Sequence, residues 1–161
     1  MIGNGIGRLA YAGEIRRFIL GGNATFTVVN GGERFTFKVK SATKDRDKNW
    51  STGNQDRSMF FVSLLTGPNN DSDFIYMGVL RQSQLDGAYR FVQTAKSKVG
   101  FDAPSAILFA KSWLCVEEGC RWPSRFEFWH EGQCCVCGRK LTVPESVASG
   151  IGPECAGKVG I

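Results

Sequence analysis

The sequence has no long hydrophobic run. No stretch of its 161 residues approaches the ~20 consecutive apolar residues that a membrane-spanning helix needs. The first residues, MIGNGIGRLAYAGEIRRF, also lack the apolar core of a secretory signal peptide. We therefore expect no membrane association and no secretion. The hydrophobic content of 42% is too high for wholesale disorder, so the sequence predicts a folded protein with a real core.

Histidine is almost absent, because His130 is the only one in the chain. A serine or cysteine nucleophile usually needs a neighbouring base such as histidine. If His130 binds a metal, no such base remains. The glycine-rich pieces at residues 3–7 and 150–152 do not sit between a strand and a helix as a phosphate-binding loop does. We therefore expect that the protein is not an enzyme.

Cysteine is absent from the first two thirds of the chain. All six cysteines lie at or after Cys115, which is unlike a disulfide scaffold spread over a short secreted chain. Their crowding favours a metal site instead.

The positive charge has the opposite distribution. The net charge of +5 equals the surplus in residues 1–60, which hold ten Lys/Arg and five Asp/Glu.

The front of the chain has the alternating pattern of strands. Residues 24–29 and 34–40 flank Asn-Gly-Gly-Glu, a hairpin signal. A turn at Gly31-Gly32 pairs Phe26 with Phe37, and a turn at Asn30-Gly31 would shift the register by two residues without changing the faces. Residues 59–65, 74–80 and 89–94 predict further strands, and residues 41–58 an exposed loop. Strands joined by turns favour an antiparallel sheet.

One main helix is expected after the sheet. Asp102 is the predicted N-cap, Pro104 suits the first turn, and Gly119 ends the apolar stripe. Residues 125–129 predict a short strand. The predicted fold is therefore α+β, with an antiparallel sheet covered by one helix over residues 1–122 and a small zinc module, a knuckle plus a short helix, over residues 123–161.

The zinc module is predicted from spacing. Cys134 and Cys137 form a C-x2-C followed by Gly138, which can hold one tetrahedral ion. Cys155 follows Pro153, so it is expected in the first turn of a helix, where the helix dipole favours a thiolate. His130 can supply a fourth ligand through a neutral imidazole. A shell closed by four protein ligands makes the zinc structural.

Two alternatives to this ligand set stay open. Cys135, Cys115 or Cys120 can replace His130, which gives four cysteine ligands. The cysteines can also be unliganded thiols buried in the core, since free cysteine packs well there.

The pattern C-x2-C-G-R-x-L-x3-E-S-x3-G-I-G-P-x-C, running from Cys134 to Cys155, resembles a small uncharacterised zinc-type domain common in bacteriophage proteins. The resemblance covers about thirty residues and implies a phage or prophage origin and action in the bacterial cytoplasm. It implies no biochemical activity. Cys135 stands where another residue type is expected, which favours treating it as a bystander.

The basic residues predict a nucleic-acid-binding protein. Phosphates attract clustered lysine and arginine, and a tryptophan can stack on a base. The alternative is a protein-interaction module that inhibits or redirects a host bacterial protein, through exposed aromatic residues. The predicted nucleic-acid contacts are Arg34, Lys38, Lys40, Lys44, Arg46, Lys48 and Trp50.

Overall fold

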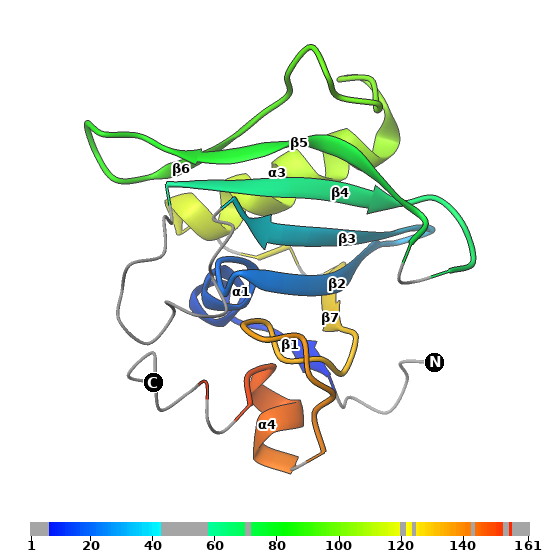
Figure 1. The fold of residues 1–161 in the computed structure, drawn as a ribbon, viewed down its shortest axis with the longest axis vertical. Coiled ribbons are helices and arrows are strands. Elements are labelled where there is room, and N and C mark those ends of the chain that lie inside the picture. Colours follow the sequence, from blue (N-terminus) through cyan, green and yellow to red (C-terminus); the bar gives the residue numbers. More distant parts are fainter. Residues whose placement is uncertain are drawn as a thin grey trace.

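Seven antiparallel strands form a single sheet in the computed structural model, in the order β1-β7-β2-β3-β4-β5-β6 (Figure 1). The structure describes residues 7–42, 58–69, 72–119, 122–123, 125–142, 144–152 and 155. Most of the predicted loop at 41–58 lies outside these ranges. The predicted α+β fold with an antiparallel sheet is confirmed.

The elements alternate little between helix and strand, as expected for an α+β fold. The strands are β1 (Arg8–Leu9), β2 (Asn23–Asn30), β3 (Glu33–Ser41), β4 (Met59–Leu65), β5 (Phe74–Gln82), β6 (Tyr89–Val92) and β7 (Phe126–His130). The helices are α1 (Ala12–Ile19), α3 (Pro104–Glu118) and α4 (Pro144–Ser149). None of the helices in the described part of the chain is long and apolar enough to cross a membrane.

The first hairpin has the predicted register. Phe26 pairs with Phe37, and Asn30 pairs with Glu33, so Gly31 and Gly32 form the two-residue turn. Gly31 has a φ of +58°, a value that such hairpin turns require and that glycine adopts without strain. The register sends the side chains of Phe26 and Phe37 to one face, which we call the inner face, and those of Lys38 and Lys40 to the other, the outer face.

Helices α1 and α3 cover the inner face, behind the sheet in Figure 1. Phe109 of α3 contacts the rings of Phe26, Phe37 and Phe91, with centroid distances of 6.5, 5.2 and 4.9 Å. Phe18 of α1 contacts the rings of Phe26 and Phe128. Aromatic rings from two helices and four strands therefore make a continuous core.

The start of α3 corrects one prediction. Ala103, and not Asp102, occupies the N-cap position, and no side chain caps the helix. Ala103 has an extended backbone with a ψ of 142° because the following residue, Pro104, disfavours the helical conformation in the residue before it. Gly119 ends the helix as predicted, with a φ of +71°.

Strand β7 connects the C-terminal part to the sheet. It lies between β1 and β2, with Trp129 paired to Arg8 on one side and to Thr27 on the other. The predicted boundary between residues 122 and 123 therefore falls just before a strand inside the common sheet. Cysteines and apolar residues of the C-terminal part also belong to the same buried cluster as the sheet, so the two predicted units share one core.

Candidate metal centre

A tight loop presents the first two cysteines of the predicted metal site. Its two arms are joined by a bridge between Gln133 and Lys140 and by a hydrogen bond from the Leu141 N–H to the Gly132 carbonyl. Within the loop, the Gly138 N–H donates to the Cys134 carbonyl and the Cys134 N–H to the Arg139 carbonyl, at 2.9 and 2.8 Å. We call residues 132–141 the knuckle.

The three predicted cysteine ligands come together. The Sγ atoms of Cys134, Cys137 and Cys155 all lie within 4.8 Å of one another. Around a tetrahedral ion with metal–sulfur bonds of about 2.3 Å, the sulfurs are separated by about 3.8 Å. The cluster is thus close to the geometry of a metal site. Cys134 and Cys155 are buried and Cys137 is exposed, so the site lies at the surface end of the core.

The backbone around Cys134 favours a thiolate. Burial alone would raise the pKa of the Cys134 thiol, but the N–H groups of Gly152, Cys137 and Val136 hold it below its ordinary value. The Gly152 N–H lies 3.2 Å and the Val136 N–H 3.4 Å from the Cys134 sulfur. Backbone donors that converge on one sulfur are typical of a cysteine that ligates a metal.

The protein alone does not favour ionisation of all three thiols. Burial, a hydrogen bond with the Cys137 side chain and the neighbouring Cys134 raise the pKa of Cys155 to about 12. A divalent cation at the centre of the cluster reverses this effect, because it stabilises each thiolate that it binds. The donor set therefore fits a soft or borderline metal ion, and binding is expected to release protons.

The Gly-Ile-Gly segment of the motif fits closely against the rest of the site. Gly150 has a φ of +80°, and a Cβ atom there would lie 2.5 Å from the ring of Phe18. Gly152 brings its N–H to the Cys134 sulfur. Gly138, with a φ of +79°, leaves no room for a Cβ beside the amide of Asn23. These glycines thus permit close approaches between the knuckle, α1 and β2.

The structure does not bring His130 into the cysteine group. The ring is buried on the inner face, stacked on Phe18 with a centroid distance of 5.6 Å. Its Nδ1 accepts a hydrogen bond from the Gly132 N–H at 3.0 Å, and its Nε2 lies in hydrogen-bond contact with the carbonyl of Val147 in α4. Because both ring nitrogens already have backbone partners, neither points a free lone pair at the sulfurs. The described group holds three of the four predicted ligands.

His130 instead joins β7 to α4. With Nδ1 acting as an acceptor, the proton of the neutral ring sits on Nε2, which donates to Val147. Burial holds the pKa of His130 below its ordinary value, because desolvation disfavours the charged ring.

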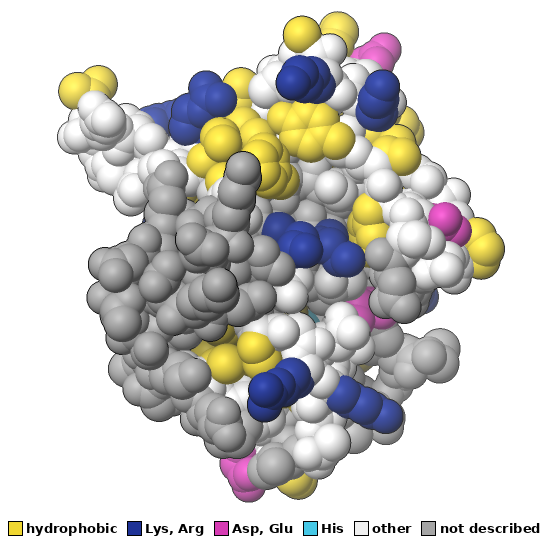
Figure 2. Space-filling view, viewed as in Figure 1, with side chains coloured by type: hydrophobic (Ala, Val, Ile, Leu, Met, Phe, Trp, Pro, Cys, Tyr) yellow, Lys and Arg dark blue, Asp and Glu magenta, His cyan; other side chains and the backbone are white. Residues whose placement is uncertain are grey.

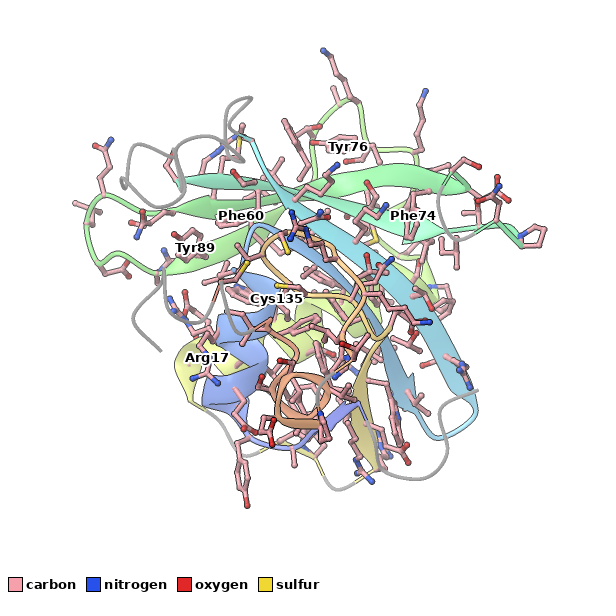
Figure 3. The ribbon with its side chains drawn as sticks, turned by 60° about the horizontal axis from the view of Figure 1, so that its bottom comes forward. Arg17, Phe60, Phe74, Tyr76, Tyr89 and Cys135 are labelled. Carbon is pink, nitrogen blue, oxygen red and sulfur yellow. The ribbon has the colours of Figure 1, made fainter. Side chains whose placement is uncertain are left out.

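Cys135 and Cys115 do not belong to the group of three thiols. Cys135 is buried against α1, and a Cβ on Gly21 would lie 2.6 Å from its carbonyl oxygen and 2.7 Å from its sulfur. Burial raises the pKa of the Cys135 thiol, which fits a packed thiol and not a ligand. In Figure 3, Cys135 lies beside α1 and the start of β2. Cys115 belongs to α3 and is not in the group, while Cys120 and the expected helix start at Pro153 lie outside the described residues.

The predicted nucleic-acid contacts are only partly within the described ranges. Arg34, Lys38 and Lys40 lie on the outer face of β3, as predicted. The other four, Lys44, Arg46, Lys48 and Trp50, lie outside the described residues.

The outer face also carries aromatic residues that the sequence analysis did not place there. Phe61 projects from β4, as the register shows. Phe74 and Tyr76 project from β5 (Figure 3). The Phe61 and Tyr76 rings meet edge to face at 6.2 Å, and the Lys38 ammonium lies 4.5 Å from the centre of the Phe74 ring. Alternation along β4 was the available signal, but the adjacent pair Phe60-Phe61 obscured which ring is buried.

Comparison with known proteins adds one finding. Residues 125–160, which include β7, the knuckle and all three clustered cysteines, match the model of a family of unknown function (DUF6011). The match covers less than half of the chain. No curated protein and no solved structure matches the chain.

Proposed function

We propose that this protein is a zinc-stabilised binding protein that acts on nucleic acid. The main support for this proposal is the positive charge of the outer face. The outward positions of β3 to β6 hold several basic residues and no acidic one, as the register defines them. The basic residues are Arg34, Lys38, Lys40, Arg81 and Arg90.

The acidic residues of the outer face lie at its other end. Glu127 accepts a hydrogen bond from the Trp129 ring N–H at 2.9 Å, and Glu131 accepts one from the Thr27 hydroxyl at 2.8 Å. On the β3–β6 half, Asp86 pairs with Arg90 at 2.9 Å, and the surplus positive charge comes from Arg34, Lys38, Lys40 and Arg81. Figure 2, which looks onto this side, has Lys and Arg groups spread between patches of hydrophobic side chains. A surface of this kind attracts phosphates over several ångströms.

Zinc is the proposed metal, and its role is structural. Three thiolates with backbone donors on the sulfur are the ligand chemistry of structural zinc sites. When bound, the ion joins the knuckle to Cys155 and so stabilises the segment that completes the sheet. The described group offers three ligands, and a closed structural site takes a fourth ligand from the protein.

Binding, and not catalysis, is the proposed activity. His130 is held by backbone partners inside the protein and is unavailable as a general base. The free cysteines suit a reducing compartment, in line with the bacterial cytoplasm and phage context that the resemblance of the motif implies.

Salt-dependent binding tests the proposal. Fluorescence anisotropy with labelled 20-nucleotide DNA and RNA, single- and double-stranded, is measured between 50 and 300 mM salt. We expect binding that weakens steeply with salt and that the double variant Arg34→Glu/Lys38→Glu abolishes at low salt. A matched control, Lys111→Glu on the exposed side of α3, should bind nearly as well as the wild type. Absence of binding to every probe at 50 mM salt would refute the proposal.

A second function is favoured by the exposed side of α3. Ile107 and Leu114 are 42% and 53% exposed there, and Phe101 just before the helix is 82% exposed. Apolar residues grouped on one helix face are typical of protein contacts. A host-protein partner predicts a complex that survives nuclease treatment and is lost in Ile107→Glu/Leu114→Glu, but not in Arg34→Glu/Lys38→Glu.

A further inference from the structure

A compact group of three rings and two lysines lies at the centre of the outer face. In the sheet register Lys38 stands opposite Ser63, which stands opposite Tyr76, while Lys40 stands opposite Phe61. Phe74 follows two residues from Tyr76 on the same strand, so all five side chains project to the same side. We call Lys38, Lys40, Phe61, Phe74 and Tyr76 the platform.

The platform is unusual for the outside of a sheet. A solvent-facing sheet surface normally carries polar side chains, whereas here three rings lie at or near the surface. Phe61 is 42% exposed, although its neighbour Phe60 is fully buried on the inner face. Covering these rings with an apolar group of a ligand would remove them from water, which favours binding.

Charge indicates the kind of ligand. Lys38 keeps its ammonium over the Phe74 ring at 4.5 Å, and Arg34 and Arg81 are exposed on the same face. A ligand that matches both features carries flat apolar groups and negative charges at short, regular intervals. Unpaired nucleotides do so, since each brings one base face and one phosphate, whereas the bases of a duplex are already stacked on one another.

We propose that the platform binds single-stranded nucleic acid, with bases stacked on Phe61 and Tyr76 and phosphates held by the lysines. This inference rests on the proposed function and narrows it to one substrate class. The Tyr76 hydroxyl lies 3.1 Å from Thr94 Oγ1, and Ser63 adds a further hydroxyl on the same face between Lys38 and Tyr76. Single-stranded DNA and RNA both carry the bases and phosphates that the platform matches, and the first experiment distinguishes them.

The first experiment compares strands on the full-length protein. Anisotropy is measured with labelled dT20, a 20-base-pair DNA duplex and rU20 at 50 mM salt. We expect dT20, rU20 or both to bind at least about tenfold more tightly than the duplex. Equal or tighter binding of the duplex than of both single strands would overturn the platform while leaving the proposed function intact. The ratio of the dT20 and rU20 affinities identifies the preferred strand, and no binding to any strand would refute both proposals.

The second experiment removes rings without removing charge. Phe61→Ala and Tyr76→Ala are each expected to weaken dT20 binding about 5- to 100-fold, with little change in the slope against salt. Phe61→Tyr keeps a ring and should keep the affinity, whereas Phe61→Leu keeps apolar area without a ring and should lose it. Phe101→Ala is the matched control, because it removes an exposed ring away from the sheet. Full affinity in both ring-deleted variants would contradict stacking.

Crosslinking locates the contact directly. A dT20 analogue that carries 5-iododeoxyuridine is irradiated in complex with the protein, and the linked residues are identified by mass spectrometry. Links to Phe61, Phe74 or Tyr76 would support the platform. Links confined to the knuckle or to the helices would overturn it. Thermal melting of each variant ensures that altered binding does not reflect unfolding.

Discussion

The sheet core and the cysteine knuckle are held together by different physics, although they share one hydrophobic cluster. The core is dry aromatic packing, in which Phe109 and Phe18 fill the inner face. The knuckle contributes Cys134, Cys135, Val136 and Leu141 to that cluster, and it is held in addition by backbone hydrogen bonds, closely placed glycines and the convergence of its thiols with Cys155. Because β7 leads into the knuckle from inside the sheet, we expect the unfolding of the knuckle to disturb the sheet as well.

Removing one metal ligand is expected to have the largest effect. Cys137→Ser changes an exposed side chain and costs little packing, yet it should abolish stoichiometric zinc binding. We expect it to destabilise the protein by about 5 kcal/mol or more, since metal binding at such sites contributes directly to folding. Metal analysis and thermal melting measure both effects. Cys115→Ser, a cysteine outside the group, should retain the metal, and equal metal content in the two variants would contradict the assignment.

A core deletion far from the thiols tests whether the two regions unfold together. Phe109→Ala removes a ring that contacts three others on the inner face, and we expect a loss of about 3–5 kcal/mol. Because the core is shared, the temperature of metal release should fall together with that of sheet unfolding. Circular dichroism and a chromophoric zinc indicator follow the two in parallel. Metal release at the wild-type temperature would instead show an independent knuckle.

Adding a single methyl group tests the contact between Gly21 and Cys135 of the knuckle. Gly21→Ala places a Cβ against the carbonyl and sulfur of Cys135, and we expect it to destabilise the protein by about 1–3 kcal/mol. Gly13→Ala in α1, the helix that ends just before Gly21, is the matched control, because no atom lies within 4 Å of its added Cβ. The control should be neutral or stabilising by up to about 1 kcal/mol. Chemical denaturation measures both, and equal effects would mean that the contact is unimportant.

The smallest expected effect concerns His130 and pH. Burial lowers its pKa in the folded protein, against the opposing influence of the Glu131 carboxylate, so the unfolded chain binds a proton more readily below about pH 6.5. Stability should therefore fall as the pH drops through that value and be level above it.

His130→Gln should remove that part of the pH dependence and lower stability at pH 7, while metal content stays unchanged. Melting curves between pH 5 and 8, restricted to conditions in which zinc stays bound, test this. Loss of zinc in the variant with retained fold would show that His130 is a ligand after all.

Local patterns predicted much of this fold. Alternation and the Gly-Gly turn correctly predicted which residues pair in the first hairpin, because a tight turn fixes the register of the two strands that it joins. The C-x2-C spacing of Cys134 and Cys137, together with the place of Cys155 after Pro153, predicted the thiol cluster.

The sequence does not indicate which distant strands pair with each other. Nothing near Phe126 indicates that its strand pairs with β2, about a hundred residues earlier. The same limitation applies to His130. Its spacing from Cys134 suits a ligand, but its place in β7 directs the ring to the inner face, where it meets Phe18. The contact of Gly21 with Cys135 depends on that same pairing, so the sequence gives no sign of it.

The position of β7 also determines the order in which the chain can fold. Arg8 of β1 pairs with Trp129, so the first strand has no place in the sheet until the last strand has been made. Closing a loop of that length is entropically costly, and folds rich in such distant pairings form slowly. During synthesis, strands β2 to β6 can assemble as they emerge. The edge of β2 stays open until β7 arrives, so the segment that leads into the clustered cysteines is the last to close the sheet.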